Sequence, residues 1–240
     1  MVLNVGITGH RANMLGDLGT GALKGVVDQV FRELRNATLK VQKSEPRFCS
    51  GMPAELRLHT GLASGADQLA ADSARLSGYF VRALLPFSAD EYRHDFEIGD
   101  ELDDFERALF AADEIVALPG DRAAADDAYV LVGKAMLDEA DVIVAIWDGQ
   151  TGRGPGGTAH VVELARQRSV PVIHIDVDWS SDLIVTRMLV GDKAIEPKRG
   201  SHLTPASYYR LLRGALSARG ALTATALPGT AGRHASATPA

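Results

Sequence analysis

Short runs of apolar residues alternate along this chain with longer stretches in which apolar residues recur every three or four positions. The short runs are almost continuously apolar, which is typical of strands buried on both faces of a parallel sheet. They predict six strands, at residues 4–8, 56–60, 80–85, 114–118, 142–147 and 172–177. The longer stretches predict helices at residues 16–41, 66–77, 100–111, 126–138 and 158–168.

This alternation predicts an α/β fold: a Rossmann-like, doubly wound, mostly parallel sheet flanked by helices on both faces. Beyond residue 178 the pattern weakens, and residues 183–189 fit either a strand or a short helix. Pro205 is favoured at a first helical position and opens a helix predicted to reach Leu216. Residues 218–240 are rich in Ala, Thr, Gly and Pro. We therefore expect a single domain over residues 1–217 and a disordered tail over 218–240.

Glycine and small polar residues gather directly after three of the predicted strands. The carboxyl ends of parallel strands meet at one edge of a sheet, so these loops are expected to line one crevice. The three segments are Thr8-Gly9-His10-Arg11, Gly61-Leu-Ala-Ser64-Gly65-Ala-Asp67, and Asp148-Gly149 leading into Gly154-Pro-Gly156-Gly157-Thr158.

The third segment has the features of a phosphate-binding loop. Helix N-termini expose unpaired backbone N–H groups and carry partial positive charge, so they favour anions. Gly156 and Gly157 would let the backbone approach such an anion closely. Arg11 would add a guanidinium, which binds phosphate through two parallel hydrogen bonds. The alternative is a tight connector in which Thr158 is the N-cap and nothing is bound.

Four further side chains are candidates for this site, and each has a structural alternative. His10 would contact a base or a phosphate, or else hold its own loop in place. Ser64 would bind a phosphate or cap the following helix. Asp67 would accept a hydrogen bond from a ribose hydroxyl or stabilise the first turn of that helix. Phe87 would stack on a base or pack in the core.

Two acids are candidates for catalysis if the protein is an enzyme. Asp148 is the best-placed acid, because it ends an apolar strand beside a glycine; its role would be ribose or base recognition, or turn formation. Glu163 lies just over one helical turn into the next helix and faces either the crevice or a neighbouring strand. The sequence lacks the His/Glu spacing of a zinc hydrolase, so we predict no metal site. A Mg²⁺ ion accompanying a nucleotide stays compatible with the sequence.

Composition narrows the classes of function. The chain has 240 residues, of which 46% are hydrophobic, enough for a sizeable core, and a net charge of −6. This acidity disfavours a general nucleic-acid binder. The single Cys49 excludes a disulfide framework and a Cys-based zinc site. The N-terminus lacks a signal-peptide pattern and no apolar run reaches the ~18 residues of a membrane span. We expect a cytoplasmic protein with no membrane association, and a homo-oligomer stays open.

With these loops the chain resembles the LOG/DprA-like superfamily, often called SLOG, whose Rossmann-like domains bind nucleotides or nucleotide-derived ligands. The resemblance covers about residues 2–177. Residues 8–11 look like the first-strand loop of the YpsA-like branch. Residues 60–67 are similar to the DprA segment Ser-Gly-x-Ala-x-Gly-Ile-Asp, and residues 155–158 look like the Pro-Gly-Gly-rich phosphate loop of the LOG branch.

The resemblance implies a protein that binds a nucleotide or a nucleotide derivative, as a sensor or as an enzyme. The enzymatic alternative is a LOG-like phosphoribohydrolase, which cleaves the N-glycosidic bond of a nucleoside monophosphate. LOG enzymes carry Pro-Gly-Gly-x-Gly-Thr followed closely by paired acids, whereas here Gly157 and Thr158 are adjacent and the next acid is Glu163. A DprA-like single-stranded DNA binder is the third alternative, disfavoured because the basic residues are dispersed.

Overall fold

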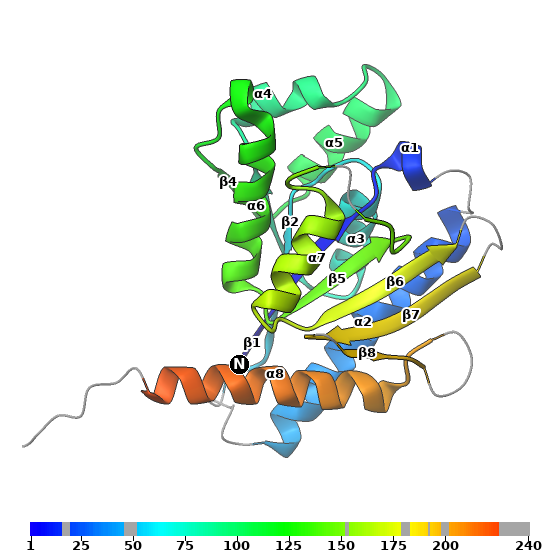
Figure 1. The fold of residues 1–240 in the computed structure, drawn as a ribbon, viewed down its shortest axis with the longest axis vertical. Coiled ribbons are helices and arrows are strands. Elements are labelled where there is room, and N and C mark those ends of the chain that lie inside the picture. Colours follow the sequence, from blue (N-terminus) through cyan, green and yellow to red (C-terminus); the bar gives the residue numbers. More distant parts are fainter. Residues whose placement is uncertain are drawn as a thin grey trace, which may run out of the picture.

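The computed structural model shows one eight-stranded sheet with helices on both faces (Figure 1). The strands follow one another across the sheet in the order β4-β3-β2-β1-β5-β6-β7-β8. The structure describes residues 1–15, 20–45, 52–151, 154–178, 183–191, 193–197 and 202–225.

Six strands pair in parallel and two extend the sheet in antiparallel fashion, which confirms the predicted fold class. All six predicted strands are present. The segment that fitted either a strand or a helix is the strand β7, and β8 was not predicted. The strands are β1 (Val2–Gly9), β2 (Glu55–Thr60), β3 (Phe80–Leu85), β4 (Glu114–Ala117), β5 (Val142–Trp147), β6 (Val172–Asp178), β7 (Leu183–Val190) and β8 (Lys193–Ile195).

The central strands are apolar because they are covered on both faces. In β5, Val142 and Ile143 are both fully buried although their side chains point to opposite faces. β4 differs from the expectation of a doubly buried strand, since three of its four residues are exposed. The reason is its position: β4 is the edge of the sheet, next to β3 alone.

The five helices predicted from periodicity are present, with ends that differ by a few residues, and the helix predicted to begin at Pro205 is α8. In the described part of the chain, the short helices α1 and α4 and two 3₁₀ turns were not predicted. α8 continues to Thr225 instead of ending at Leu216, and residues 226–240 of the expected tail lie outside the described residues, as do residues 16–19. No helix of the described part of the chain is long and apolar enough to cross a membrane. The helices are α1 (Ala12–Leu15), α2 (Thr20–Ser44), α3 (Ala66–Leu76), α4 (Ala89–Tyr92), α5 (Asp100–Phe110), α6 (Ala125–Glu139), α7 (Thr158–Gln167) and α8 (Pro205–Thr225), with the 3₁₀ turns η2 (Arg93–Asp95) and η3 (Arg122–Ala124).

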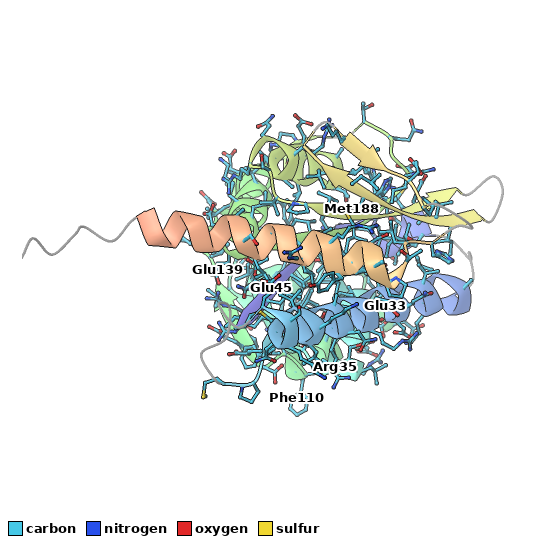
Figure 2. The ribbon with its side chains drawn as sticks, turned by 90° about the horizontal axis from the view of Figure 1, so that it is seen from below. Glu33, Arg35, Glu45, Phe110, Glu139 and Met188 are labelled. Atoms are coloured by element: carbon cyan, nitrogen blue, oxygen red, sulfur yellow. The ribbon has the colours of Figure 1, made fainter. Side chains whose placement is uncertain are left out.

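The helices form two layers. α2, α3, α5 and α8 pack on one face of the sheet, and α6 and α7 pack on the other. α8 lies alongside α2 (Figure 2). Tyr208 and Leu212 of α8 are buried, and Arg213 pairs with Glu45 at the end of α2, 2.7 Å apart. The C-terminal helix therefore closes the core on this face.

The strand order places a topological switch at the centre of the sheet. From β1 the chain turns through α1 and α2 to β2 on one side, whereas from β5 it turns through α7 to β6 on the other. Adjacent strands whose connections diverge in this way leave a crevice beyond their carboxyl ends, which is where open α/β sheets bind ligands.

Candidate functional site

A cavity of about 550 Å³ lies at this switch point. Its walls come from the loop after β1, the loop between β2 and α3, the helix α6, and the segment that joins β5 to α7. The sequence-predicted site residues that line it are Gly9, His10, Arg11, Gly61, Asp67, Asp148, Gly156, Gly157 and Thr158. Four others, Ser64, Gly65, Phe87 and Glu163, are not part of its lining.

His10 joins three parts of the site through its backbone and its ring. Its N–H donates to the Ile146 carbonyl and its carbonyl accepts from the Ala66 N–H, each at 3.0 Å. Its Nε2 lies 3.3 Å from the backbone nitrogen of Asp148 and 3.2 Å from Oδ1 of the same residue. A neutral ring accepts from that N–H, and a ring protonated at Nε2 donates to the carboxylate. His10 and Asp148 thus form a polar pair on the cavity wall.

Asp148 has the turn geometry that its position beside Gly149 predicted. Its Oδ1 accepts from the Gln150 N–H at 3.0 Å. Trp147 just before it is satisfied by the same turn, because its indole N–H donates to the Gln150 carbonyl at 3.0 Å. One oxygen of Asp148 therefore fixes the turn and meets His10, while the residue also lines the cavity.

Asp67 closes its own loop and also reaches the cavity. Its Oδ2 accepts from the Gly61 N–H at 2.9 Å and from the Thr60 hydroxyl at 3.2 Å. Burial raises the pKa of the Asp67 carboxyl to about 6, although the hydrogen bonds and the charge of Arg11 act in the opposite direction. The internal bonds favour a structural role for this carboxyl.

The glycine before α3 serves close packing. Gly65 is the N-cap of α3 at φ +90°, and a Cβ there would lie 2.5 Å from the Ala12 nitrogen. The expectation that Ser64 caps this helix is wrong, since no side chain makes the cap bond. Ser64 is instead buried beside Glu101.

The two glycines before α7 have different roles: Gly156 packs against α6, and Gly157 caps α7. Gly156, at φ +79°, packs on α6, because a Cβ there would lie 2.7 Å from the Tyr129 Cβ; its N–H donates to His160 Nδ1 at 2.9 Å. Gly157 is the N-cap, at φ −73°, and the nearest atom to its Cβ position is the Gly154 oxygen at 3.5 Å. The alternative of Thr158 as the N-cap is therefore wrong. Residues 157–159 line the cavity, and the first amides of a helix have no intrahelical partner.

Charged and aromatic side chains from three other segments lie near Arg11. Its guanidinium lies 3.9 Å from Asp95 Oδ2. Asp95 also pairs with Arg122 at 2.7 Å and accepts a hydrogen bond from the Tyr129 hydroxyl. Burial and this carboxylate together raise the pKa of Tyr129 to about 12. Tyr129 lies in the second turn of α6, outside any sequence motif, so its position at the cavity follows from the tertiary fold.

Two predicted site residues face away from the cavity. Phe87 is buried and packs edge-to-face against Tyr92 and Tyr129, with ring centroids 6.4 and 6.1 Å apart. Its alternative as a packing aromatic is what the structure shows. Glu163 is about half exposed on α7 and bonds Gln167 and Arg166 of the same helix, at 3.0 and 3.4 Å.

The inner wall of the cavity is apolar. Val132 and Met136 of α6 and Val161 of α7 line it. α6 and α7 are in close contact here, because a Cβ on Gly133 would lie 2.9 Å from Val161 Cγ2. Among the described residues, no group of three or more His, Cys, Asp or Glu could hold a metal ion. The site thus joins an apolar wall, hydrogen-bonding carboxylates and a helix N-terminus.

Three solved structures are similar to this chain at a low level. DNA processing protein A from Streptococcus pneumoniae has a TM-score of 0.49 at 16% identity, covering 76% of this chain and 53% of that chain. DNA processing protein A from Helicobacter pylori, described for its single-stranded DNA binding mode, has a TM-score of 0.44 at 15% identity, with 93% and 81% covered. The structural genomics target TM1055 has a TM-score of 0.42 at 18% identity, with 71% and 72% covered.

The chain spans about half the length of the Streptococcus pneumoniae protein. Two of these structures carry the DprA name of the superfamily that the sequence motifs resemble. No family model and no curated protein matches the chain. With TM-scores below 0.5, these structures indicate no function for this chain.

Proposed function

We propose that this protein binds a nucleotide or a nucleotide derivative in the cavity beyond β1 and β5, with a phosphate on the N-terminus of α7. The observation that carries the proposal is the position of this N-terminus on the wall of a cavity at the switch point of the sheet. Open α/β sheets bind ligands at such a point, and helix N-termini bind phosphate through their free amides.

The remaining walls supply the other contacts that a nucleotide needs. Asp148 offers a carboxylate oxygen to ribose hydroxyls. Val132, Met136 and Val161 offer an apolar surface to a base, and Tyr129 adds an aromatic ring. A cavity of about 550 Å³ lies in the size range of small-molecule sites. We propose a binding or sensing role as the function of this site.

A thermal-shift screen tests this proposal. The ligands are nucleoside mono-, di- and triphosphates, NAD and ADP-ribose, and mass analysis of the denatured protein identifies any nucleotide that co-purifies. A ligand at about 100 times its Kd should stabilise the fold by about 2.7 kcal/mol. A protein that carries no nucleotide, and whose melting temperature does not respond to any of these compounds at millimolar concentration, contradicts the proposal.

One observation favours a second function, hydrolysis of the N-glycosidic bond of the bound nucleotide. His10 and Asp148 form a pair in the cavity that can accept a proton from water. Glu163, the other acid named from the sequence, is not on the cavity wall. The assay follows free base released from AMP, GMP and CMP, and Asp148→Asn is the control. Release at the rate of buffer alone, in the wild type, rejects this function for those substrates.

Single-stranded DNA is a separate partner class, because the Helicobacter pylori structure is described for binding it. We propose that this chain does not share that property. In the part of the cavity wall that the structure describes, Arg11 is the only lysine or arginine, whereas strand binding needs several phosphate contacts. Retardation of a labelled strand at low salt would contradict this proposal.

A further inference from the structure

A largely buried carboxylate contacts two of the residues that line the cavity, and it also pairs with an arginine outside the lining. Asp95 belongs to η2, and its side chain is only 8% exposed. It meets Arg122 of η3 at 2.7 Å, the Tyr129 hydroxyl of α6, and Arg11 after β1 at 3.9 Å. Arg11 and Tyr129 line the cavity, whereas Asp95 and Arg122 do not.

Arg11 supplies the positive side-chain charge that an anionic ligand would meet in the described part of the cavity. Among the described lining residues it is the sole lysine or arginine, against three aspartates, Asp67, Asp126 and Asp148. The positive charge of Arg11 also acts on Asp67 and on Glu101. A ligand that carries several phosphates would therefore meet more negative than positive charge here.

Arg122 lies closer to the Asp95 carboxylate than Arg11 does. Arg122 is the tighter partner, and it is held further by a hydrogen bond to the Glu91 carbonyl at 3.2 Å and by the Phe87 ring at 5.5 Å. Arg11 has the longer contact with Asp95. Because Arg122 already neutralises much of the Asp95 charge, Asp95 offsets the positive charge of Arg11 only in part. The rest of that charge is available to a ligand in the cavity.

We propose that Asp95 is a specificity-determining residue, which limits the positive charge that Arg11 offers and so restricts the cavity to ligands with a single phosphate. The inference rests on the proposed nucleotide site and goes beyond it by naming the ligand class and the residue that selects it. Removal of the Asp95 charge leaves both arginines uncompensated, so a second phosphate becomes acceptable. Removal of Arg122 has the opposite effect, because Asp95 then has only Arg11 to pair with.

The first test compares adenosine, AMP, ADP and pyrophosphate as ligands of the wild type and of Asp95→Asn. Asparagine keeps the shape of aspartate and an acceptor for the Tyr129 hydroxyl. We expect the ratio of the Kd for ADP to the Kd for AMP to fall by about tenfold or more, with adenosine unchanged. We also expect pyrophosphate to raise the melting temperature of the variant and not of the wild type. The matched control is Asp90→Asn, which removes an exposed aspartate paired with Arg93 in the same segment.

The second variant, Arg122→Gln, keeps the proposal testable if Asp95→Asn does not fold. We expect it to weaken AMP more than adenosine, the reverse of the effect of Asp95→Asn. An unchanged ADP-to-AMP ratio and pyrophosphate response in Asp95→Asn overturn the inference, and so does an unchanged AMP-to-adenosine ratio in Arg122→Gln. If the wild type binds no nucleotide, the proposed function fails, while the pyrophosphate response of Asp95→Asn still decides the role of Asp95.

Discussion

Two loops with the same glycine-rich composition border the cavity, and they use their glycines differently. In the loop from β2 to α3, Asp67 bonds Thr60 and Gly61, and Gly65 lets the chain approach Ala12. In the loop from β5 to α7, a Cβ on Gly157 would make only an ordinary contact, 3.5 Å from the Gly154 oxygen, and Gly157 belongs to the cavity wall. The first loop is held together by its own hydrogen bonds and close contacts, whereas the second exposes backbone to the cavity. Composition alone therefore does not separate a packing glycine from a binding glycine.

A glycine-to-valine substitution should mainly lower the stability of the fold in the first loop, and mainly weaken ligand binding in the second. Gly65→Val combines an unfavourable φ of +90° with a Cβ 2.5 Å from backbone, so we expect a loss of about 4 kcal/mol in the free energy of unfolding. Gly78→Val is the matched control, because Gly78 has φ +79° in open space and should cost only about 1–2 kcal/mol. Urea unfolding measures both. Equal losses at the two positions would show that the close approach at Gly65 is not tight.

The buried carboxyl of Asp67 in the first loop should also make the free energy of unfolding depend on pH. The pKa of Asp67 is about 6 in the folded state against 3.8 for the free side chain, so the folded state binds the proton more tightly between these values. The stability that Asp67 contributes is complete below about pH 4 and is lost as the pH rises to about 6, by on the order of 3 kcal/mol.

The measurement is the difference in unfolding free energy between the wild type and Asp67→Asn at a series of pH values. We expect the wild type to lose stability relative to the variant as the pH rises through this window. Asp72→Asn, an exposed aspartate on the same helix, should keep the wild-type profile. A difference that does not vary with pH would mean that Asp67 is not desolvated as its surroundings indicate.

In the second loop, Gly157→Val should affect the ligand more than the fold. Its φ of −73° is accessible to valine, and the nearest atom to the new Cβ is 3.5 Å away. Replacing glycine at an N-cap by valine costs about 1 kcal/mol or less. The new methyl groups would keep a phosphate from the α7 amides, so we expect about tenfold weaker nucleotide binding or worse. Calorimetry with AMP measures this, and full affinity together with a lowered melting temperature would make the loop a structural connector.

The smallest effects should separate the two acids named from the sequence. Asp148→Asn should weaken nucleoside binding by about 0.5–1.5 kcal/mol, the value of one hydrogen bond. Glu163→Gln changes an acid whose partners are on its own helix, so binding should stay at the wild-type level and stability should change by about 0.5 kcal/mol or less. Adenosine titrations compare the two variants, and a larger loss in Glu163→Gln would place the sugar elsewhere.

The strands of the sheet could be predicted from the sequence because parallel strands buried on both faces are continuous apolar runs. β3 and β5 have the predicted bounds, and the strand order then follows from pairings that no single sequence displays. The cavity residues that were named lie at the end of a strand or between that strand and the first turn of the next helix. This is the edge at which open α/β sheets bind ligands, so their place in the chain predicts their place at the site. Tyr129 was not named from the sequence, because its position on α6 and its tertiary contacts, rather than a local motif, bring it to the cavity. Phe87 was named for its chemistry, but its ring is enclosed by Tyr92 and Tyr129.

The most direct test of the central claim is a nuclear magnetic resonance titration of the ¹⁵N-labelled protein with AMP, followed at the backbone amides. If the phosphate lies on the N-terminus of α7, the amide signals of Gly157, Thr158 and Ala159 should move most, and adenosine should leave them nearly unchanged while it still moves signals of the apolar wall. Signals of residues 65–67 should move little, because that loop is closed. Saturable binding of AMP that leaves the three α7 amides in place would contradict the account.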